Sequence, residues 1–172
     1  GKLRPAFRSD GTVTAGNPSG MNDGASFLII ASEEAVEKYN LKPMAEILSF
    51  ATTAKKPSLF GIAPVTATEK ALEKAGLDLK DIELFEFNEA FAGQTVAVAK
   101  QLSEIYGVST DWIYEKTNVN GGAIALGHPI GASAARITTT LLHEMKKRNL
   151  TYGLASLCVG GGHGITVVVK SA

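Results

Sequence analysis

Apolar residues in this chain gather into short runs and into stripes with helical spacing. Residues 27–31, Phe-Leu-Ile-Ile-Ala, form an all-apolar run that is typical of a β-strand buried on both faces. Ser32 follows and predicts the N-cap of a short helix over residues 33–39, whose first-turn acids suit the helix dipole. A second apolar stretch covers residues 45–50.

The middle of the chain predicts two longer helices. Pro64 is placed to begin a helix that Gly76 ends, and its inward residues would be Val65, Leu72 and Ala75. Residues 82–87 are rich in strand formers and lead directly into Asn88, a residue type that caps helices. The helix after it carries one stripe spaced by three and four residues: Phe91, Thr95, Val98, Leu102 and Ile105.

The last third of the chain predicts one more strand and helix, then two strands. Residues 117–126 predict a strand that leads into a helix over 131–148, with Ile137, Leu141 and Met145 inward. Residues 153–157 and 165–169 predict an antiparallel pair at or near the edge of a sheet. Strands that alternate with helices favour a layered α/β domain with a mixed sheet.

Composition narrows the function classes. The 172 residues carry 17 Lys and Arg against 17 Asp and Glu, so charge gives no reason to expect a nucleic acid or an anionic membrane as partner. No apolar run reaches the roughly 20 residues that span a bilayer, and the start does not resemble a signal peptide. The single cysteine, Cys158, allows no internal disulfide, so we expect a reduced thiol and a cytoplasmic location.

Half of the glycines lie in one quarter of the chain. Nine of the 18 fall between Gly121 and Gly164, where a backbone that must approach a ligand would need them. Asn88, His128 and Cys158 each follow a predicted strand, and ligands of open α/β sheets bind at that end of the strands. Each also has a structural explanation: a helix cap, a residue that closes a turn, and a small buried apolar side chain.

The surroundings of His128 and Cys158 favour chemistry on a carbonyl group. Cys158 lies beside Gly160 and two further glycines, which leave backbone N–H groups open next to the thiol. His128 lies before a helix N-terminus, where a neutral imidazole is favoured. Only Arg136 is charged between residues 116 and 144, so the pocket is expected to be dry and to stabilise an oxyanion.

Two other kinds of site are not supported by the spacing. The histidines and Cys158 have no metal-ligand spacing, and we expect His143 on an exposed helix face and His163 in a loop. The glycines at 160–164 lead into a strand rather than a helix, so they do not form a dinucleotide fingerprint.

Four motifs together resemble the C-terminal half of thiolases. In chain order they are Thr-Ala-Gly-Asn-Pro-Ser-Gly-Met-Asn-Asp-Gly at 14–24, Asn-Glu-Ala-Phe-Ala at 88–92, Asn-Val-Asn-Gly-Gly-Ala-Ile-Ala-Leu-Gly-His-Pro-Ile-Gly at 118–131 and Cys-Val-Gly-Gly-Gly-His-Gly at 158–164. The resemblance covers essentially the whole chain. It implies a loop-domain remnant over 1–19, the last strand and helix of the N-terminal domain over 20–43, and the C-terminal domain over 44–172.

The resemblance also implies a reaction and roles for individual residues. Thiolases join or cleave acyl groups on coenzyme A by a Claisen reaction, so coenzyme A thioesters would be substrates and no cofactor is expected. Cys158 would be the acid/base, His128 would activate a nucleophilic cysteine, Asn88 would hold a water in one oxyanion hole, and the Gly160 N–H would serve a second hole. Coenzyme A contacts would fall on Phe7, Ala15 and Ser19, with Phe60 and Phe91 beside the acyl pocket.

The sequence departs from the thiolase pattern in two ways. Ser-Ala-Ala-Arg at 133–136 replaces the frequent Ser-Gly-Ala-Arg, a change expected to affect only helix packing. The family's nucleophilic cysteine has no counterpart, so we expect a fragment or one of two chains, inactive without the N-terminal thiolase half.

Several functions stay open. The leading one is an acetyl-CoA C-acetyltransferase of acyl-CoA and fatty acid metabolism, a homo-oligomer when complete. The others are a 3-ketoacyl-CoA thiolase of broader chain length, a non-catalytic module that binds coenzyme A or lipid, and a piece that serves dimerisation.

Overall fold

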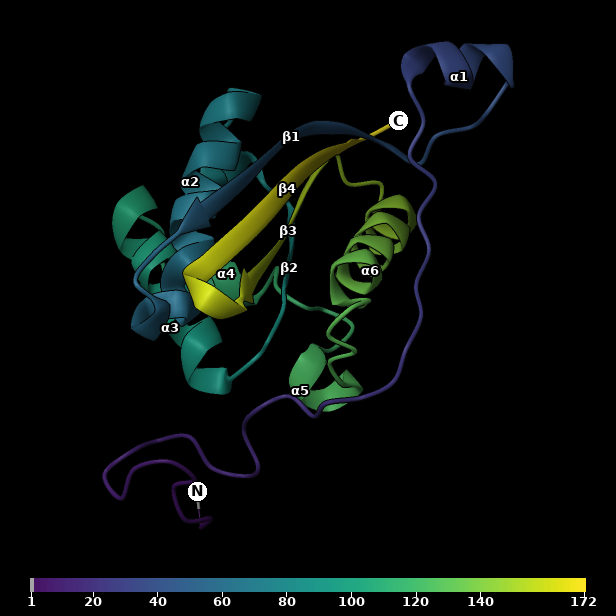
Figure 1. The fold of residues 1–172 in the computed structure, drawn as a ribbon. Coiled ribbons are helices and arrows are strands. Elements are labelled where there is room, and N and C mark those ends of the chain that lie inside the picture. The colour runs from purple at the N-terminus through teal and green to yellow at the C-terminus, as the bar shows by residue number, and fades with distance from the viewer. Residues whose placement is uncertain (1) are drawn as a thin grey trace.

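The protein folds around one mixed four-stranded sheet, in a computed structural model that describes residues 2–172. The strands are β1 (Ala45–Ala54), β2 (Leu84–Phe87), β3 (Tyr152–Val159) and β4 (His163–Ser171). Their order across the sheet is β1-β4-β3-β2 (Figure 1). The predicted α/β class with a mixed sheet is confirmed.

The predicted pairing of β3 and β4 is confirmed, and each of the two strands lies next to an edge strand rather than at the edge itself. β4 is antiparallel to both β1 and β3, and β2 runs parallel to β3, so β3 and β4 are the two inner strands. The hairpin is local, whereas the partners on either side come from distant segments that apolar spacing does not reveal. His163 is the exposed first residue of β4 rather than a loop residue.

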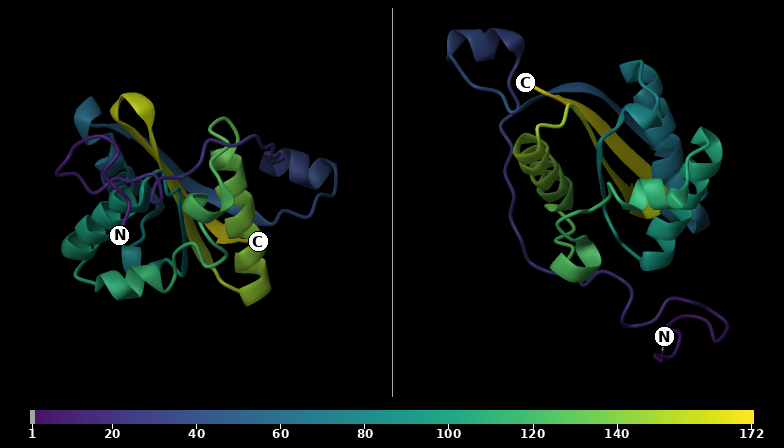
Figure 2. Two further views of the ribbon diagram at one scale, coloured as in Figure 1. Left: turned by 90° about the horizontal axis from the view of Figure 1, so that it is seen from below. Right: turned by 180° about the vertical axis from the view of Figure 1, so that it is seen from behind.

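Helices cover both faces of the sheet. On one face lie α2 (Ala63–Ala75), α3 (Ala92–Tyr106) and α4 (Thr110–Tyr114), and on the other lies α6 (Ser133–Arg148), as Figures 1 and 2 show. The remaining short helices are α1 (Glu33–Lys38), α5 (Ala123–Leu126) and the 3-10 turns η1 (Pro57–Ile62), η2 (Leu79–Asp81) and η3 (Gly160–Gly162). No helix within residues 2–172 is long and apolar enough to cross a membrane.

Alternation along the strands divides the core between the two faces. Phe85 of β2 packs with α2, α3 and α4, and it stacks on Phe87 with ring centroids 5.5 Å apart. Leu84, one residue earlier, packs with α6. The three predicted inward residues of α6, Ile137, Leu141 and Met145, are all buried there. The predicted exposure of His143 on the outer face of α6 is also confirmed.

Two helix boundaries follow the predicted capping residues. The Ser32 hydroxyl accepts a hydrogen bond from the Ala35 N–H at 3.2 Å and caps α1. Gly76 ends α2 in the left-handed conformation with φ 67°, as the sequence predicts, although α2 begins one residue before Pro64.

The start and end of α3 differ from the prediction. Phe91 occupies the N-cap position, and Asn88 is no cap, because its N–H still donates to the Ser156 carbonyl of β3 at 2.9 Å. At the other end Ile105 is 48% exposed, since Tyr106 and Val108 pack against that part of the core. Val98 and Leu102, in the middle of the stripe, are buried as expected.

Two predicted strands are absent from the described residues. The run at 27–31 is not strand, and Phe27 and Ile29 are 89% and 92% exposed, because no strand within residues 2–172 pairs with it. Residues 117–126 form a single bridge from Thr117 to Phe85, then a turn and α5. The glycines at 121 and 122 disfavour a continuous strand in this segment.

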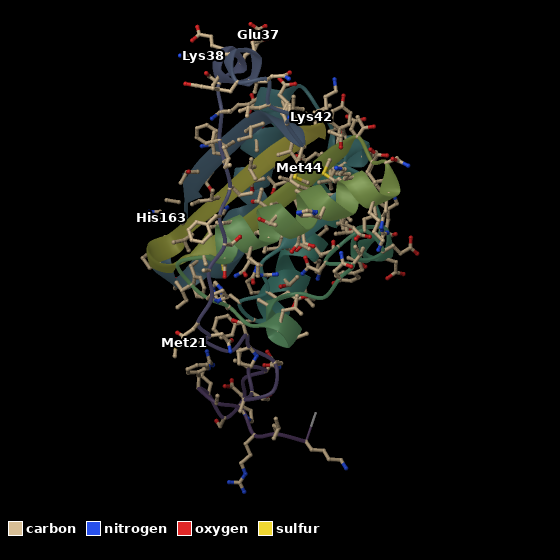
Figure 3. All side chains as sticks on the ribbon, turned by 90° about the vertical axis from the view of Figure 1, so that its right-hand side faces the viewer. Met21, Glu37, Lys38, Lys42, Met44 and His163 are labelled. Atoms are coloured by element: carbon tan, nitrogen blue, oxygen red, sulfur yellow. The ribbon has the colours of Figure 1, made fainter. Side chains whose placement is uncertain are left out.

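The N-terminal segment runs along the outside of the layers. It passes α5 and α6 before it reaches α1, which stands apart from the sheet (Figures 1 and 2). In Figure 3, Lys38 of α1 lies near the top of the molecule, and Met21 lies below the sheet, with the preceding residues of the N-terminal segment beyond it.

A chain of buried hydroxyl groups links α2 to the inner strands. Thr68 of α2 lies 3.2 Å from the Thr166 hydroxyl, which lies 2.8 Å from the Ser156 hydroxyl. The Ser156 hydroxyl donates to the Ile165 carbonyl at 3.0 Å. The three side chains are buried with their polar atoms satisfied by one another.

Candidate active site

His128 lies in the turn between α5 and α6, and the N-terminal segment holds this turn. Its N–H donates to the Gly20 carbonyl at 3.0 Å, and the Asn22 side-chain oxygen lies 3.3 Å from the same N–H. Gly127, just before it, has φ 98°, a conformation that side chains rarely adopt. The hydrogen bonds from the N-terminal segment and the unusual φ of Gly127 together fix the backbone of His128.

The imidazole of His128 has a polar partner at each nitrogen. Nδ1 lies 2.6 Å from Oγ of Ser133, and Nε2 lies 3.4 Å from Nδ2 of Asn88. The structure thus brings together two of the predicted site residues, His128 and Asn88. Ser133 is a third member of the cluster, and the sequence analysis predicted no role for it.

The electrostatic surroundings keep this imidazole neutral. Burial lowers the pKa of His128 from its ordinary value, and the positive charge of Arg136 lowers it further. The sequence argument gave the helix N-terminus as the cause of neutrality, and these two causes act in the same direction. A neutral ring has one nitrogen free to accept a proton.

Asn88 is buried at the end of β2 with one unpaired atom. Its Oδ1 has no hydrogen-bond partner within residues 2–172. A buried amide oxygen without a protein partner is costly unless water or a ligand meets it. The orientation of Asn88 therefore suits a residue that holds a water.

Cys158 lies near the end of β3, opposite Gly164 of β4. Its side chain is 7% exposed, and burial raises the pKa of the thiol from its ordinary value. The group rests as a thiol at neutral pH, and its conjugate thiolate is correspondingly a stronger base. Within residues 2–172 no hydrogen bond joins Cys158 to His128, although Asn88 contacts Ser156, two residues before Cys158.

The fold requires glycine at some of the positions after Cys158 but not at all of them. A Cβ at Gly162 would overlap the Lys55 carbonyl, and one at Gly164 would overlap the backbone of Ala63. By contrast, a Cβ at Gly160 would meet nothing within 4 Å, and the φ of Gly160 is not positive. The fold itself therefore requires the later glycines but not Gly160.

Some of the predicted coenzyme A and acyl contacts approach this cluster. Ser19 donates through its N–H to the Ala90 carbonyl at 3.0 Å, which places it beside the 88–91 loop. Phe60 and Phe91 meet edge to face with centroids 6.3 Å apart. Phe7 is 79% exposed and Ala15 is exposed, and no hydrogen bond or ring contact joins either side chain to the cluster within the described residues.

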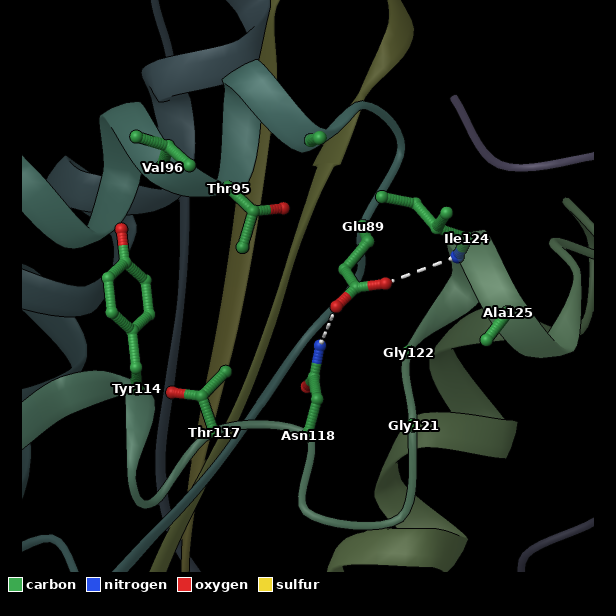
Figure 4. A pocket seen from close by; sticks show the side chains of 11 residues that line it. Glu89, Thr95, Val96, Tyr114, Thr117, Asn118, Gly121, Gly122, Ile124 and Ala125 are labelled. Atoms are coloured by element: carbon green, nitrogen blue, oxygen red, sulfur yellow. Dashed lines mark hydrogen bonds between the residues drawn. The ribbon is translucent and has the colours of Figure 1, made fainter. Parts of the chain in front are cut away.

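Glu89 and Asn118 form a clamp that the motif analysis did not assign. The Glu89 carboxylate accepts from Asn118 Nδ2 at 3.0 Å and from the Ile124 N–H at 3.2 Å (Figure 4). Asn118 also bonds both backbone groups of Phe87, at 2.8 and 2.9 Å. The clamp fixes the Asn88 loop to the segment that leads to His128. Two residues in the sequence could have indicated this clamp: Glu89, the acid directly after Asn88, and Asn118, which opens the next motif.

A pocket of about 500 Å³ opens beside this clamp. Its lining includes Glu89, Thr95, Tyr114, Thr117 and Gly121 (Figure 4). None of Asn88, His128 and Cys158 lines it, so it is separate from the candidate catalytic groups. Among residues 2–172 no group of three or more His, Cys, Asp or Glu side chains could hold a metal ion.

Comparisons with known proteins agree with this fold and these motifs. The C-terminal domain of thiolases matches residues 41–171, and the N-terminal domain of thiolases matches residues 1–34. The chain therefore belongs to the thiolase family. The boundaries predicted at residues 19 and 43 stay predictions.

Similar proteins carry two names within that family. An acetyl-CoA acetyltransferase of Escherichia coli is 56% identical over 170 residues, and a human mitochondrial 3-ketoacyl-CoA thiolase is 53% identical over 170 residues. Each match covers 99% of this chain and 41% of the relative. The chain thus spans about two fifths of the length of the curated relatives it matches.

Solved structures show the same arrangement. The acetyl-CoA acetyltransferase of Bacillus anthracis superposes with a TM-score of 0.91 at 47% identity, over 99% of this chain and 41% of that one. A human mitochondrial 3-ketoacyl-CoA thiolase in complex with CoA superposes with a TM-score of 0.85 at 46% identity, with the same coverage.

Proposed function

We propose that this chain is the C-terminal portion of an acetyl-CoA C-acetyltransferase. The reaction is the reversible Claisen condensation of two acetyl-CoA molecules to acetoacetyl-CoA and coenzyme A. The observation that carries the proposal is the pairing of the Asn88 amide with His128 Nε2 at 3.4 Å. The loop that begins at Asn88 also contains Phe91, and its Ala90 carbonyl binds the N–H of Ser19. Relatives named acetyl-CoA acetyltransferase support the choice of reaction.

In this proposal His128 activates the nucleophile, and His128 and Asn88 together form the hole for the oxygen of the coenzyme A thioester. His128 Nε2 accepts the proton of a nucleophilic thiol, and the resulting N–H then donates to the thioester oxygen. The free Asn88 Oδ1 supports its role as the holder of a water that donates to the same oxygen. Both groups stabilise negative charge as it develops on that oxygen.

Cys158 and Gly160 act on the second substrate and on the acyl-enzyme. The Cys158 thiol gives its proton to the coenzyme A thiolate that leaves the first acetyl-CoA. The Cys158 thiolate then takes a proton from the α-carbon of the second acetyl-CoA, and its raised pKa supports its strength as a base. The carbanion attacks the acyl carbonyl, and the nucleophilic thiolate leaves. The N–H of Gly160 donates to the acyl-enzyme oxygen, which is supported by the open space around this residue.

Coenzyme A thioesters are the substrates, and the proposal includes no resident cofactor. Phe7, Ala15 and Ser19 would contact the coenzyme A portion, and the edge-to-face rings of Phe60 and Phe91 would narrow the acyl pocket. A solved thiolase that superposes on this chain contains CoA, which supports this ligand class. Assembly into a homo-oligomer and a cytoplasmic location stay predictions, and one relative is mitochondrial.

The nucleophile lies outside these residues in the proposal. Cys158 is the only cysteine of the 172 residues, and it has the acid/base role. We therefore expect the purified 172-residue chain to show no thiolysis of acetoacetyl-CoA, and activity to require the N-terminal thiolase half. Thiolysis by this chain alone at the rate of a complete thiolase would refute the proposed division of roles.

Cys158→Ala in the complete enzyme tests the reaction itself. Proton exchange at the α-carbon of acetyl-CoA should fall by about 100-fold or more, because the base is gone. Cys158→Ser is the matched control for packing: it should fold equally well and also lose exchange, since a hydroxyl is a far weaker acid than a thiol. Unchanged exchange in both variants would favour a non-catalytic module that binds coenzyme A or lipid.

A 3-ketoacyl-CoA thiolase of broader chain length is the second candidate. It is favoured by the human relative of that name at 53% identity. The ratio of kcat/KM for acetoacetyl-CoA to that for a longer 3-ketoacyl-CoA separates the two. A clear preference for acetoacetyl-CoA supports the acetyltransferase, and a preference for the longer substrate overturns it.

A further inference from the structure

Ser133 is the fully buried first residue of α6, and its hydroxyl lies between two polar groups. Oγ is 3.0 Å from the Pro129 carbonyl oxygen and 2.6 Å from His128 Nδ1. From this geometry we infer that Ser133 is a positioning residue that holds His128 as the tautomer with its proton on Nδ1.

The Ser133 hydroxyl has a single proton, so it can donate only one hydrogen bond. A carbonyl oxygen can only accept, so the contact with Pro129 is a hydrogen bond only if the Ser133 hydroxyl donates it. Oγ must then accept from His128, which requires an N–H at Nδ1. The reverse arrangement would bring the lone pairs of two oxygens to 3.0 Å in a buried place.

The other side of the ring agrees with this tautomer but does not determine it. Asn88 Nδ2 faces Nε2 at 3.4 Å, as expected when Nε2 carries a lone pair. An asparagine amide can be turned over with little change of shape, so this contact alone fits either tautomer. Ser133 has no such freedom, because the Pro129 carbonyl, four residues earlier in the turn before α6, holds its proton.

The consequence for the proposed function is a histidine prepared to accept a proton at Nε2. Free histidine favours the tautomer with the proton on Nε2, which would have no lone pair for a nucleophilic thiol. With Ser133 in place, Nε2 is the acceptor in every molecule, and the imidazolium formed later keeps its hydrogen bond to Oγ. The role of Ser133 in rate rests on the proposed function, whereas the tautomer does not.

The tautomer is measured directly by ¹⁵N NMR of labelled histidine in the complete protein, above the pKa of the ring. We expect a protonated-type shift at Nδ1 and an unprotonated-type shift at Nε2 of His128. In Ser133→Ala the pattern should move toward the opposite tautomer. A wild-type spectrum with the proton on Nε2, or an unchanged pattern in Ser133→Ala, overturns the inference. The wild-type spectrum tests it even where the variant does not fold.

Kinetics give a second readout and a matched control. Ser133→Ala should lower kcat for acetoacetyl-CoA thiolysis by about 10- to 100-fold with little change in KM. Thr138→Ala removes an exposed hydroxyl of α6 that bonds the Ala134 carbonyl, also four residues earlier, at 2.8 Å, and it should change neither kcat nor the tautomer. Loss of rate in Thr138→Ala as well would mean that helix stability, rather than the tautomer, is responsible.

The two readouts separate the inference from the proposed function. A complete protein without thiolase activity whose His128 still has the Nδ1 proton, dependent on Ser133, refutes the function and supports the inference. An active enzyme with the tautomer unaffected by Ser133→Ala refutes the inference and leaves the function standing.

Discussion

The two glycine-rich loops of this protein hold their catalytic candidates in different ways. In the loop after Cys158, Gly162 and Gly164 press against the backbone of the segment that joins β1 to α2. In the loop before His128, the nearest neighbours of Gly122 and Gly127 are the side chains of Glu89 and Asn22. A backbone neighbour cannot yield without moving the sheet, whereas a side chain can rotate. The first loop is therefore part of the core, and the second is held by replaceable polar contacts.

The loops also differ in charge. Near His128 the charged groups Arg136 and Glu86 are buried, and the guanidinium of Arg136 has no hydrogen-bond partner within residues 2–172. Around Cys158 the buried polar groups are the hydroxyls of Ser156, Thr166 and Thr68. Only the His128 side is therefore expected to make stability depend on pH near neutrality.

The largest effect is expected from Gly162→Ala. Gly162 has φ 100°, and an added Cβ would overlap the Lys55 carbonyl. The Lys55 N–H donates to the Gly162 carbonyl at 2.8 Å, so the two backbone segments are tied together at this point. Strain and overlap together should lower the free energy of unfolding by about 3 kcal/mol or more. Urea denaturation followed by circular dichroism measures it. A loss below about 1 kcal/mol would mean that the loop is not held by the backbone contact.

The next effect tests the buried charge beside the Asn88 loop. Burial raises the pKa of Glu86 to about 7, although Arg136 acts against this shift. The folded state then binds more protons than the unfolded state between the unfolded value of 4.5 and about 7. Stability from this group therefore falls as pH rises through that window and is lowest above it, by an amount on the order of 3 kcal/mol.

His128 opposes this trend below pH 6.5. Its pKa is lowered in the folded state, so its contribution falls as pH decreases through the unfolded value of 6.5. Glu86→Gln isolates the carboxyl group: the difference in unfolding free energy between wild type and variant should favour the wild type more at pH 5 than at pH 8. An equal difference at both pH values contradicts a raised pKa for Glu86.

Gly127→Ala should have a smaller effect than Gly162→Ala. Its φ of 98° is strained for alanine, but the atom that an added Cβ would meet is Oδ1 of Asn22, at 2.6 Å, on a side chain that can move. The expected loss is about 1–2 kcal/mol of unfolding free energy. Combining Gly127→Ala with Asn22→Ala should recover part of it, measured as a coupling free energy in a double-mutant cycle. Strict additivity would show that the contact does not matter.

The smallest effect on stability is expected from Gly160→Ala. An added Cβ has open space, so the unfolding free energy should change by less than about 0.5 kcal/mol. If the Gly160 N–H serves an oxyanion hole, kcat of the complete enzyme should fall nonetheless, because a methyl group crowds the bound acyl group. A large loss of stability would show that all three glycines of η3 are structural.

How much the sequence predicted depended on whether the signal was local. The Ser32 cap, the Gly76 end and the three inward residues of α6 were correct because the signal for each, a capping residue or an apolar spacing, lies within a few helical turns. The run at 27–31 was misread because a strand also needs a partner, and none is present among residues 2–172. Apolar composition alone does not report pairing.

The candidate site shows the same limit. Its motifs supplied His128, Asn88 and Cys158, but the spacing alone favoured Asn88 as a helix cap, which is wrong, and it predicted no role for Ser133. The contact of Asn88 with His128 spans 40 residues, and no spacing rule predicts it. The contact of Ser133 with His128 could have been predicted, because a serine in the first turn of a helix, five residues after a histidine, can place its hydroxyl against the imidazole ring.

The hydroxyl chain from Thr68 to Ile165 has a directional order. Because the Ser156 proton is committed to the Ile165 carbonyl, Thr166 must donate to Ser156 and Thr68 to Thr166. The first two O–H dipoles then run from α2 across β4 to β3, the strand that carries Cys158, and the third returns from Ser156 to the Ile165 carbonyl of β4. Reversing one would require reversing all three, so the dipoles present a fixed, rather than fluctuating, field at that end of the sheet.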